Sequence, residues 1–241
     1  MGDGLRRLVD IKKELKTKCP CGYGISRVLF RTVRNHRSRK SVFTDRFRNN
    51  GFAGRESISG RGSDLVQTEI IRKEIPLLVQ EVDAKSFLDA PCGDFFWMKE
   101  TELGVAKYTG VDIVPDLIEQ NRKQYGNETR EFMVLDIVKD RVPRADIILC
   151  RDCLVHLSHK DIRSVLRNFK RSGSTYILTT TFTGCHENKD VSPVGWRPIN
   201  LQRPPYNFRK PLKQINENCT LDGGKHTDKC LGLWKLDSID L

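Results

Sequence analysis

The chain has 241 residues, of which 38% are hydrophobic, with 42 Lys and Arg against 31 Asp and Glu and eight cysteines. A chain of this length buries about 70% of the surface it exposes when unfolded, so it needs neither disulfides nor a metal to fold. Its long apolar runs exclude a fully disordered protein, and the lack of a repeat excludes a fibrous one. No stretch approaches the roughly 18 apolar residues of a membrane span, and no signal sequence is recognisable at the N-terminus. We therefore expect a soluble protein without a transmembrane segment; the compartment stays open, with a cytoplasmic location favoured.

The positive charge is concentrated at the N-terminus. Residues 1–50 hold 14 Lys and Arg against 4 Asp and Glu, whereas the rest of the chain holds 28 against 27. This asymmetry predicts a basic N-terminal arm over residues 1–50, partly helical or disordered, followed by a nearly neutral domain over residues 51–241. Such an arm can bind nucleic acid or another anionic surface by releasing counterions. A solvated extension that binds nothing in particular is the simpler alternative.

From residue 65 onward, helix-like and strand-like patterns alternate. Apolar residues at helical spacing predict a helix from Leu65 that is interrupted near Pro76. Strands are predicted at Ser86–Asp89, Tyr108–Asp112, Phe132–Asp136, Ala145–Cys150 and Thr175–Phe182, and helical segments at Phe95–Leu103, Asp116–Tyr125 and, capped by Ser158, up to Arg171. A late strand at Leu231–Leu236 is expected to pair at the sheet edge with a strand near residues 212–219. The alternation predicts an α/β fold with a doubly wound, mostly parallel sheet.

Acidic residues follow the predicted strands, namely Asp89, Asp112, Asp136 and the pair Arg151-Asp152. Ligands of doubly wound sheets bind outside the carboxyl ends of the strands, so these side chains mark the expected site. Asp112 lies 23 residues beyond Asp89, a spacing that suits a carboxylate holding a ribose diol. The intervening turn has a single glycine, and the chain has no G-x-x-x-x-G-K-[ST] sequence, which excludes a P-loop. A ligand with ribose and adenine but no phosphate fits best.

The block Leu88–Phe95 (L-D-A-P-C-G-D-F), with Trp97 behind it, resembles motif I of class I S-adenosylmethionine-dependent methyltransferases. It is most similar to a poorly characterised branch with a D-x-P-C-G-D-F-x-W motif I. The similarity extends over roughly residues 50–236, through the blocks Gly110–Asp116, Leu135–Ile137, Cys150–Ser158 and Gly195–Leu201. The family implies a Rossmann-like methyltransferase fold with S-adenosyl-L-methionine as cofactor.

The resemblance also implies which residues contact the cofactor. Its amino-acid end would be surrounded by Asp89, Gly93 and Asp94. Asp112 would accept from both ribose hydroxyls, and Asp136 would reach the adenine amino group. Ile113 and Ile137 would pack on the adenine ring. The Gly- and Ser-rich loop Glu56–Ser63, with Gln67, resembles a lid over the cofactor; a flexible linker is the alternative.

Two sets of residues are candidates for catalysis and for acceptor binding. His156 suits removal of a hydroxyl proton near neutral pH, and Asp152, four residues earlier, could share a helical face and orient the ring. The alternative is that His156 only packs, because methyl transfer can proceed by proximity alone. Trp196, Arg197 and Asn200 lie in the Pro-rich loop after the fifth strand and could stack on and hydrogen-bond a polar acceptor, or merely anchor that loop.

No metal site is predicted. Cys92, Cys150 and Cys153 are interpreted as small packing residues. Cys185, His186, Cys219, His226 and Cys230 match no closed zinc spacing, and whether Cys219 and Cys230 pair stays open.

The sequence therefore favours an S-adenosylmethionine-dependent methyltransferase that methylates oxygen of a small polar or glycan-like acceptor. The alternative is a noncatalytic module that keeps the nucleoside pocket and uses the basic arm to hold RNA or an anionic surface.

Overall fold

The structure is a computed structural model that describes residues 38–191 and 195–241. Most of the predicted basic arm, residues 1–37, lies outside the described residues. The compact unit of the described chain is Arg39–Leu241. It therefore begins earlier than the boundary expected between residues 50 and 51, because residues 39–48 form a helix, α3 (Arg39–Arg48), that is part of this unit.

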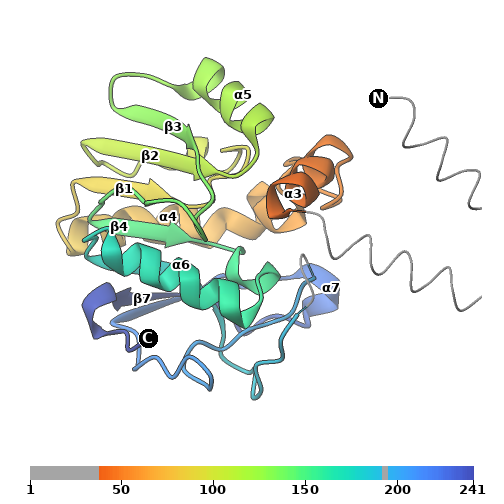
Figure 1. The fold of residues 1–241 in the computed structure, drawn as a ribbon, viewed down its shortest axis with the longest axis vertical. Coiled ribbons are helices and arrows are strands. Elements are labelled where there is room, and N and C mark those ends of the chain that lie inside the picture. Colours follow the sequence, from red (N-terminus) through yellow and green to blue (C-terminus); the bar gives the residue numbers. More distant parts are fainter. Residues whose placement is uncertain (1–37, 192–194) are drawn as a thin grey trace, which may run out of the picture. The chain divides into compact units, whose positions relative to one another are not determined.

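The described residues form a seven-stranded sheet in the order β3-β2-β1-β4-β5-β7-β6 (Figure 1). The strands are β1 (Ser86–Asp89), β2 (Lys107–Asp112), β3 (Arg130–Val134), β4 (Ile147–Cys150), β5 (Tyr176–Phe182), β6 (Lys213–Asn216) and β7 (Lys229–Lys235). The first five are parallel to one another. β7 runs antiparallel to β5 and to the edge strand β6. The doubly wound, mostly parallel sheet and its late edge pairing are thus confirmed.

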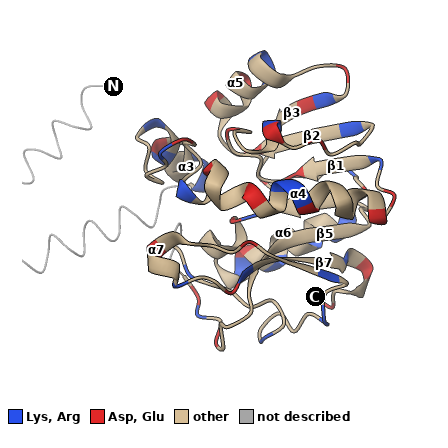
Figure 2. Ribbon diagram, turned by 180° about the vertical axis from the view of Figure 1, so that it is seen from behind, with Lys and Arg blue, Asp and Glu red and all other residues tan. Residues whose placement is uncertain are grey.

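Helices cover both faces of the sheet. α6 (His159–Arg171) lies in front of the sheet in Figure 1, and α4 (Leu65–Glu81) lies in front of it in the reverse view of Figure 2. α5 (Pro115–Tyr125) contributes Ile118 to the core on the α4 side. Successive strand residues point to opposite faces, so Phe87 joins the α4 core and Leu88 joins the α6 core.

In α6, both the predicted cap and the predicted apolar stripe are present. The Ser158 side chain accepts a hydrogen bond from the Asp161 backbone N–H and caps the helix. The apolar positions that recur at helical spacing form one fully buried stripe, made of Ile162, Val165, Leu166 and Phe169. β4, which is buried along its whole length, packs against this helix in the centre of the sheet.

Two helical predictions differ from the structure. α4 runs without interruption through Pro76, because Ile75 and Leu78 on either side of the proline are both packed on the sheet and outweigh one missing backbone donor. Only a short 3₁₀ turn, Met98–Glu100, forms where a helix was expected over Phe95–Leu103. Phe95 has a φ of 58°, which a right-handed helix cannot accommodate.

Within residues 38–191 and 195–241, no helix is both long enough and apolar enough to cross a lipid bilayer.

Candidate active site

A cavity of about 420 Å³ opens at the carboxyl edge of the parallel strands, a volume typical of sites for small ligands. The residues expected from the sequence that line it are Asp89, Gly93, Asp94, Asp112, Ile113, Asp136, Ile137, Asp152, His156 and Trp196. The strand register brings them together: β2 and β3 end level, since Asp112 pairs with Val134, and β1 ends only two residues short of β2, since Asp89 pairs with Gly110. Arg197 and Asn200 are not among the lining residues.

The turn after β1 depends on a glycine. Gly93 has a φ of 53°, and a Cβ added there would lie 2.3 Å from Ser59 Oγ. Its backbone N–H donates to Asp112 Oδ2 over 3.3 Å. Gly93 therefore lets the turn, the loop that bears Ser59 and the end of β2 approach one another closely.

Two buried carboxyl groups lie at the ends of the central strands. Asp112 accepts from the backbone N–H groups of Gly93 and Val114, at 3.3 and 3.0 Å. Burial raises the pKa of Asp112 to about 6, against the effect of those N–H groups. Asp89 accepts from the Tyr108 hydroxyl at 2.8 Å, and burial raises the pKa of Asp89 to about 7. Burial therefore raises the pKa of both carboxyl groups toward neutrality.

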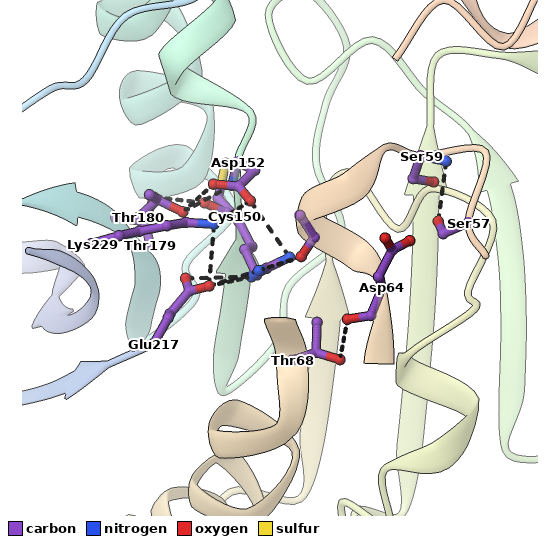
Figure 3. A network of polar contacts seen from close by, with 12 residues as sticks. Ser57, Ser59, Asp64, Thr68, Cys150, Asp152, Thr179, Thr180, Glu217 and Lys229 are labelled. Carbon is purple, nitrogen blue, oxygen red and sulfur yellow. Dashed lines mark hydrogen bonds and ion pairs between the residues drawn. The ribbon is translucent and has the colours of Figure 1, made fainter. Parts of the chain in front are cut away.

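The loop Glu56–Ser63 packs on the turn after β1. The Asp94 carboxylate accepts from Ser57 Oγ, Ser59 Oγ and the Ile58 backbone N–H, each at 2.9 Å. Ser57 and Ser59, which lie side by side in Figure 3, are also linked by a hydrogen bond from the Ser59 N–H to Ser57 Oγ. Residues 58–63 line the cavity. The loop is thus a wall of the cavity, and Asp94 fastens its first half, Ser57 to Ser59.

A second wall comes from α3, which the sequence analysis assigned to the arm, and from the turn behind it. Phe43, Phe47 and Phe52 line the cavity alongside Ile113 and Ile137. The signal that could have revealed this wall is the four-residue spacing of Phe43 and Phe47, which places both on one face of a helix.

Ion pairs fasten α3 to the edge of the sheet. Arg39 donates to Asp136 at 3.2 Å and to Asp161 at 3.1 Å. At the other end of the helix, Arg48 pairs with Asp116 at 2.8 Å. The Asp136 carboxylate, expected to be a ligand group, therefore also holds this helix in place.

Beyond β4, four charged side chains form one network (Figure 3). Lys229 Nζ lies 2.6 Å from Asp152 Oδ2 and 3.1 Å from Glu217 Oε2, and Arg151 pairs with Glu217 at 2.6 Å. Burial raises the pKa of Asp152, but Lys229 and Arg151 outweigh it and lower that pKa to about 2. The sequence pointed to neither Glu217, which directly follows β6, nor Lys229, the first residue of β7, because both lie far along the chain from Asp152.

His156 is held by a carbonyl group. Its Nδ1 lies 2.7 Å from the Gly195 carbonyl oxygen, which can only accept a hydrogen bond. Nδ1 therefore carries the proton, and Nε2 keeps a free lone pair. Burial lowers the pKa of His156 against the opposing effects of Gly195 and Asp152, which favours the neutral ring. The expectation that Asp152 orients this ring is corrected, because the Asp152 carboxylate is engaged by Lys229 and Gly195 holds the imidazole.

Arg197 and Asn200 do not face the cavity, contrary to expectation. Arg197 Nη1 donates to the carbonyl oxygens of Leu154 and Val155 at 2.9 and 2.8 Å. Asn200 Nδ2 donates to two carbonyl oxygens of the chain after β5, at 3.2 and 3.1 Å. Arg197 thus ties the proline-rich loop to the turn Leu154–His156, and Asn200 ties it to the chain just after β5, since buried carbonyl groups need donors. Trp196 alone of the three predicted acceptor residues lines the cavity.

In the described part of the chain, no group of three or more His, Cys, Asp or Glu residues is arranged to hold a metal ion. Cys219 and Cys230 are both buried and free there.

Residues 87–173, from β1 to just beyond α6, match the family model of a methyltransferase domain. These residues carry a methyltransferase domain. The cavity fits S-adenosylmethionine as cofactor, because the buried carboxyl group of Asp112 at the end of β2 can take a ribose diol and the aromatic and aliphatic side chains beside it can take adenine. Among curated proteins, none matches this chain in sequence.

Solved structures are similar to this chain, and the first of those named here supports its fold. The N-methyltransferase NodS from Bradyrhizobium japonicum WM9 is 11% identical, with a TM-score of 0.52, over 71% of this chain and 97% of that one. The methyltransferase domain of bacterial CtHen1 is 14% identical, with a TM-score of 0.42, and the alignment spans 48% of this chain and 66% of that domain's chain. Human N-acetylserotonin methyltransferase, solved with S-adenosylmethionine, is 18% identical over 58% of this chain and 41% of its own, with a TM-score of 0.45.

Proposed function

We propose that the protein transfers the methyl group of S-adenosylmethionine to a hydroxyl oxygen of a small polar or glycan-like acceptor, with His156 as general base. The observation that carries this proposal is the hydrogen bond between His156 Nδ1 and the Gly195 carbonyl oxygen. It leaves Nε2 as an unprotonated nitrogen on a ring that lines the cavity. A neutral imidazole is the side chain best suited to take a hydroxyl proton near neutral pH.

Each cofactor contact is assigned by the strand after which the residue stands. In this proposal Asp112 accepts from the ribose hydroxyls, and Asp136 accepts from the adenine amino group while it holds Arg39. Ile113 and Ile137 pack on one side of adenine, and the phenylalanines of α3 pack on the other. The backbone at Gly93 contacts the amino-acid end beside Asp89, while Asp94 contributes by fastening the loop Glu56–Ser63.

When bound, S-adenosylmethionine would supply an electrophilic methyl group. His156 would accept the proton of the acceptor hydroxyl at Nε2 while that oxygen takes the methyl group, and S-adenosylhomocysteine would be the leaving group. Gly195 fixes the ring through Nδ1, so the base does not rotate away from the cavity. The loop Glu56–Ser63 and α3 would shield the bound cofactor from water, so that fewer water molecules surround the reacting groups.

Substitution of His156 tests this assignment. Loss of a general base costs about 10²–10⁴ in rate, so His156→Ala should lower kcat that far while the affinity for S-adenosylhomocysteine stays unchanged. Radiolabelled S-adenosylmethionine with a panel of sugars, phenols and nucleosides provides the assay. His186→Ala, at an exposed histidine outside the cavity, is the matched control. Turnover by His156→Ala at the wild-type rate between about pH 6 and 9 would show that His156 only packs and that proximity carries the reaction.

A further inference from the structure

Three aromatic rings form one corner of the cavity, referred to below as the aromatic corner and made of Phe182, Trp196 and His226. The ring centroids of Trp196 and His226 are 5.0 Å apart, and those of Phe182 and Trp196 are 5.9 Å apart. The residues come from the end of β5, the loop that follows it and the connection between β6 and β7. Trp196 is 47% exposed although its neighbours fix it edge-to-face, so an apolar surface faces the cavity.

The charged network beside this corner presents only one of its members to solvent. The Asp152 side chain is 30% exposed, whereas those of Lys229, Arg151 and Glu217 are 6, 5 and 1% exposed. The two cations are thus consumed by carboxylates beneath the surface, as Figure 3 shows for Lys229 between Asp152 and Glu217. Arg151 and Lys229 also line the cavity, but both are paired and nearly buried, so the most exposed group of the network is the Asp152 carboxylate.

The negative charge of Asp152 discriminates between classes of acceptor. A carboxylate or phosphate on the acceptor would be desolvated next to Asp152. The cations among the described lining residues, Arg39, Arg61, Arg151 and Lys229, are each already paired with a carboxylate. Arg61, which also lines the cavity, is paired with Asp222 at 3.7 Å. A hydroxyl group, in contrast, can donate a charge-assisted hydrogen bond to the Asp152 carboxylate.

We propose that the acceptor is a neutral sugar ring, whose apolar face lies on Trp196 in the aromatic corner and whose hydroxyl groups donate to Asp152. This inference rests on the proposed function, because it names the acceptor of that reaction. The loop Glu56–Ser63 contacts the charged network beside Asp152. Arg151 Nη2 donates to the Gly62 carbonyl oxygen at 2.8 Å, and a Cβ on Gly62 would lie 3.1 Å from Asp152 Oδ2. The sugar therefore enters from the side of Trp196, with the loop Glu56–Ser63 closing the opposite side.

Binding to the full-length protein saturated with S-adenosylhomocysteine tests the acceptor class without requiring methyl transfer. Saturation-transfer NMR is measured with the methyl glycosides of glucose, galactose and mannose, and with glucuronate, glucosamine and phenol at the same concentration. At least one neutral glycoside should bind, and glucuronate should not. Binding of glucuronate as strongly as the glycosides, binding of glucosamine or phenol with no glycoside bound, or no binding of any glycoside overturns the proposal.

Two variants locate the binding. Trp196→Ala should weaken glycoside binding at least tenfold, whereas Leu212→Ala, at another exposed apolar side chain, directly before β6 and outside the cavity lining, should not change it. Asp152→Asn leaves two buried cations against one carboxylate, so it should shift the preference toward glucuronate. If Asp152→Asn does not fold, Trp196→Ala decides alone, and unchanged glycoside binding in that variant overturns the proposal. Because binding is read without turnover, a failed His156 assay and a failed sugar assay remain separate results.

Discussion

Gly93 has both a positive φ and a close neighbour that a side chain would strike. Gly104 has only the positive φ, so comparing the two glycines separates the two effects. Gly93→Ala places a methyl group against Ser59 and holds a side chain at a φ of 53°. Gly104 also has a positive φ, 70°, but nothing lies within 4 Å of an added Cβ. Gly104→Ala should therefore cost only the left-handed backbone term, roughly 1–2 kcal/mol of unfolding free energy.

Gly93→Ala should cost more than Gly104→Ala and should also weaken binding of S-adenosylhomocysteine, because it displaces the loop that Asp94 holds. Thermal or denaturant unfolding, together with calorimetry of the ligand, measures both effects. Equal losses of stability in the two variants, with ligand affinity unchanged in Gly93→Ala, would contradict the close approach at Ser59.

Asp112 carries a testable pH dependence. Burial raises its pKa to about 6, so the carboxyl group of the free protein protonates as the pH falls through that value. Only the ionised form accepts from both ribose hydroxyls, and affinity for S-adenosylhomocysteine should therefore be full above about pH 7 and fall toward pH 5. Asp112→Asn should weaken binding at pH 7.5 by about 1.5–3 kcal/mol and should flatten this fall. Calorimetry across this range, with the exposed Asp240→Asn as control, checks the assignment; a wild-type pH profile retained in Asp112→Asn contradicts it.

At the scale of elements, the sequence was informative wherever local signals and burial agree. α6 shows its cap and its buried stripe within one stretch of chain, and β4 is apolar at every position, so both could be predicted. Asp89, Gly93 and Asp112 were found because they stand at strand ends in a known motif. These positions depend on the order of the elements rather than on any particular side-chain direction.

Other parts of the site depend on side-chain direction or on distant partners, which spacing along the chain does not encode. Arg197 and Asn200 stand in the expected loop, but they turn toward buried carbonyl oxygens. Glu217 and Lys229 meet Asp152 and its neighbour only because β7 returns antiparallel to β5. Phe43 and Phe47 of α3 were missed because the high positive charge of residues 1–50 led to their assignment to a separate arm.

For the molecule as a whole, the basic segment divides into two parts with different expected roles. Residues 1–37 contain 10 Lys and Arg against 3 Asp and Glu, and we expect any affinity for RNA or anionic vesicles to reside there and to fall steeply with salt. Residues 39–52 carry the wall of Phe43, Phe47 and Phe52 and the ion pairs of Arg39 with Asp136 and Asp161. Two truncations therefore should not behave alike.

A chain that begins at residue 38 should bind S-adenosylhomocysteine as the full chain does and should lose salt-sensitive binding to RNA or anionic vesicles. A chain that begins at Gly51 should in addition lose affinity for S-adenosylhomocysteine by at least tenfold, because removal of α3 opens one side of the adenine sleeve and leaves the Asp136 carboxylate without Arg39. Calorimetry gives the affinity for S-adenosylhomocysteine, and sedimentation with vesicles or a filter assay with RNA at increasing salt gives the affinity for anions.

Circular dichroism confirms that each chain is folded. If the chain from Gly51 is folded and binds S-adenosylhomocysteine as tightly as the full chain, α3 is not part of the cofactor site; if it retains the binding to RNA or vesicles, the arm is not the element that binds anions.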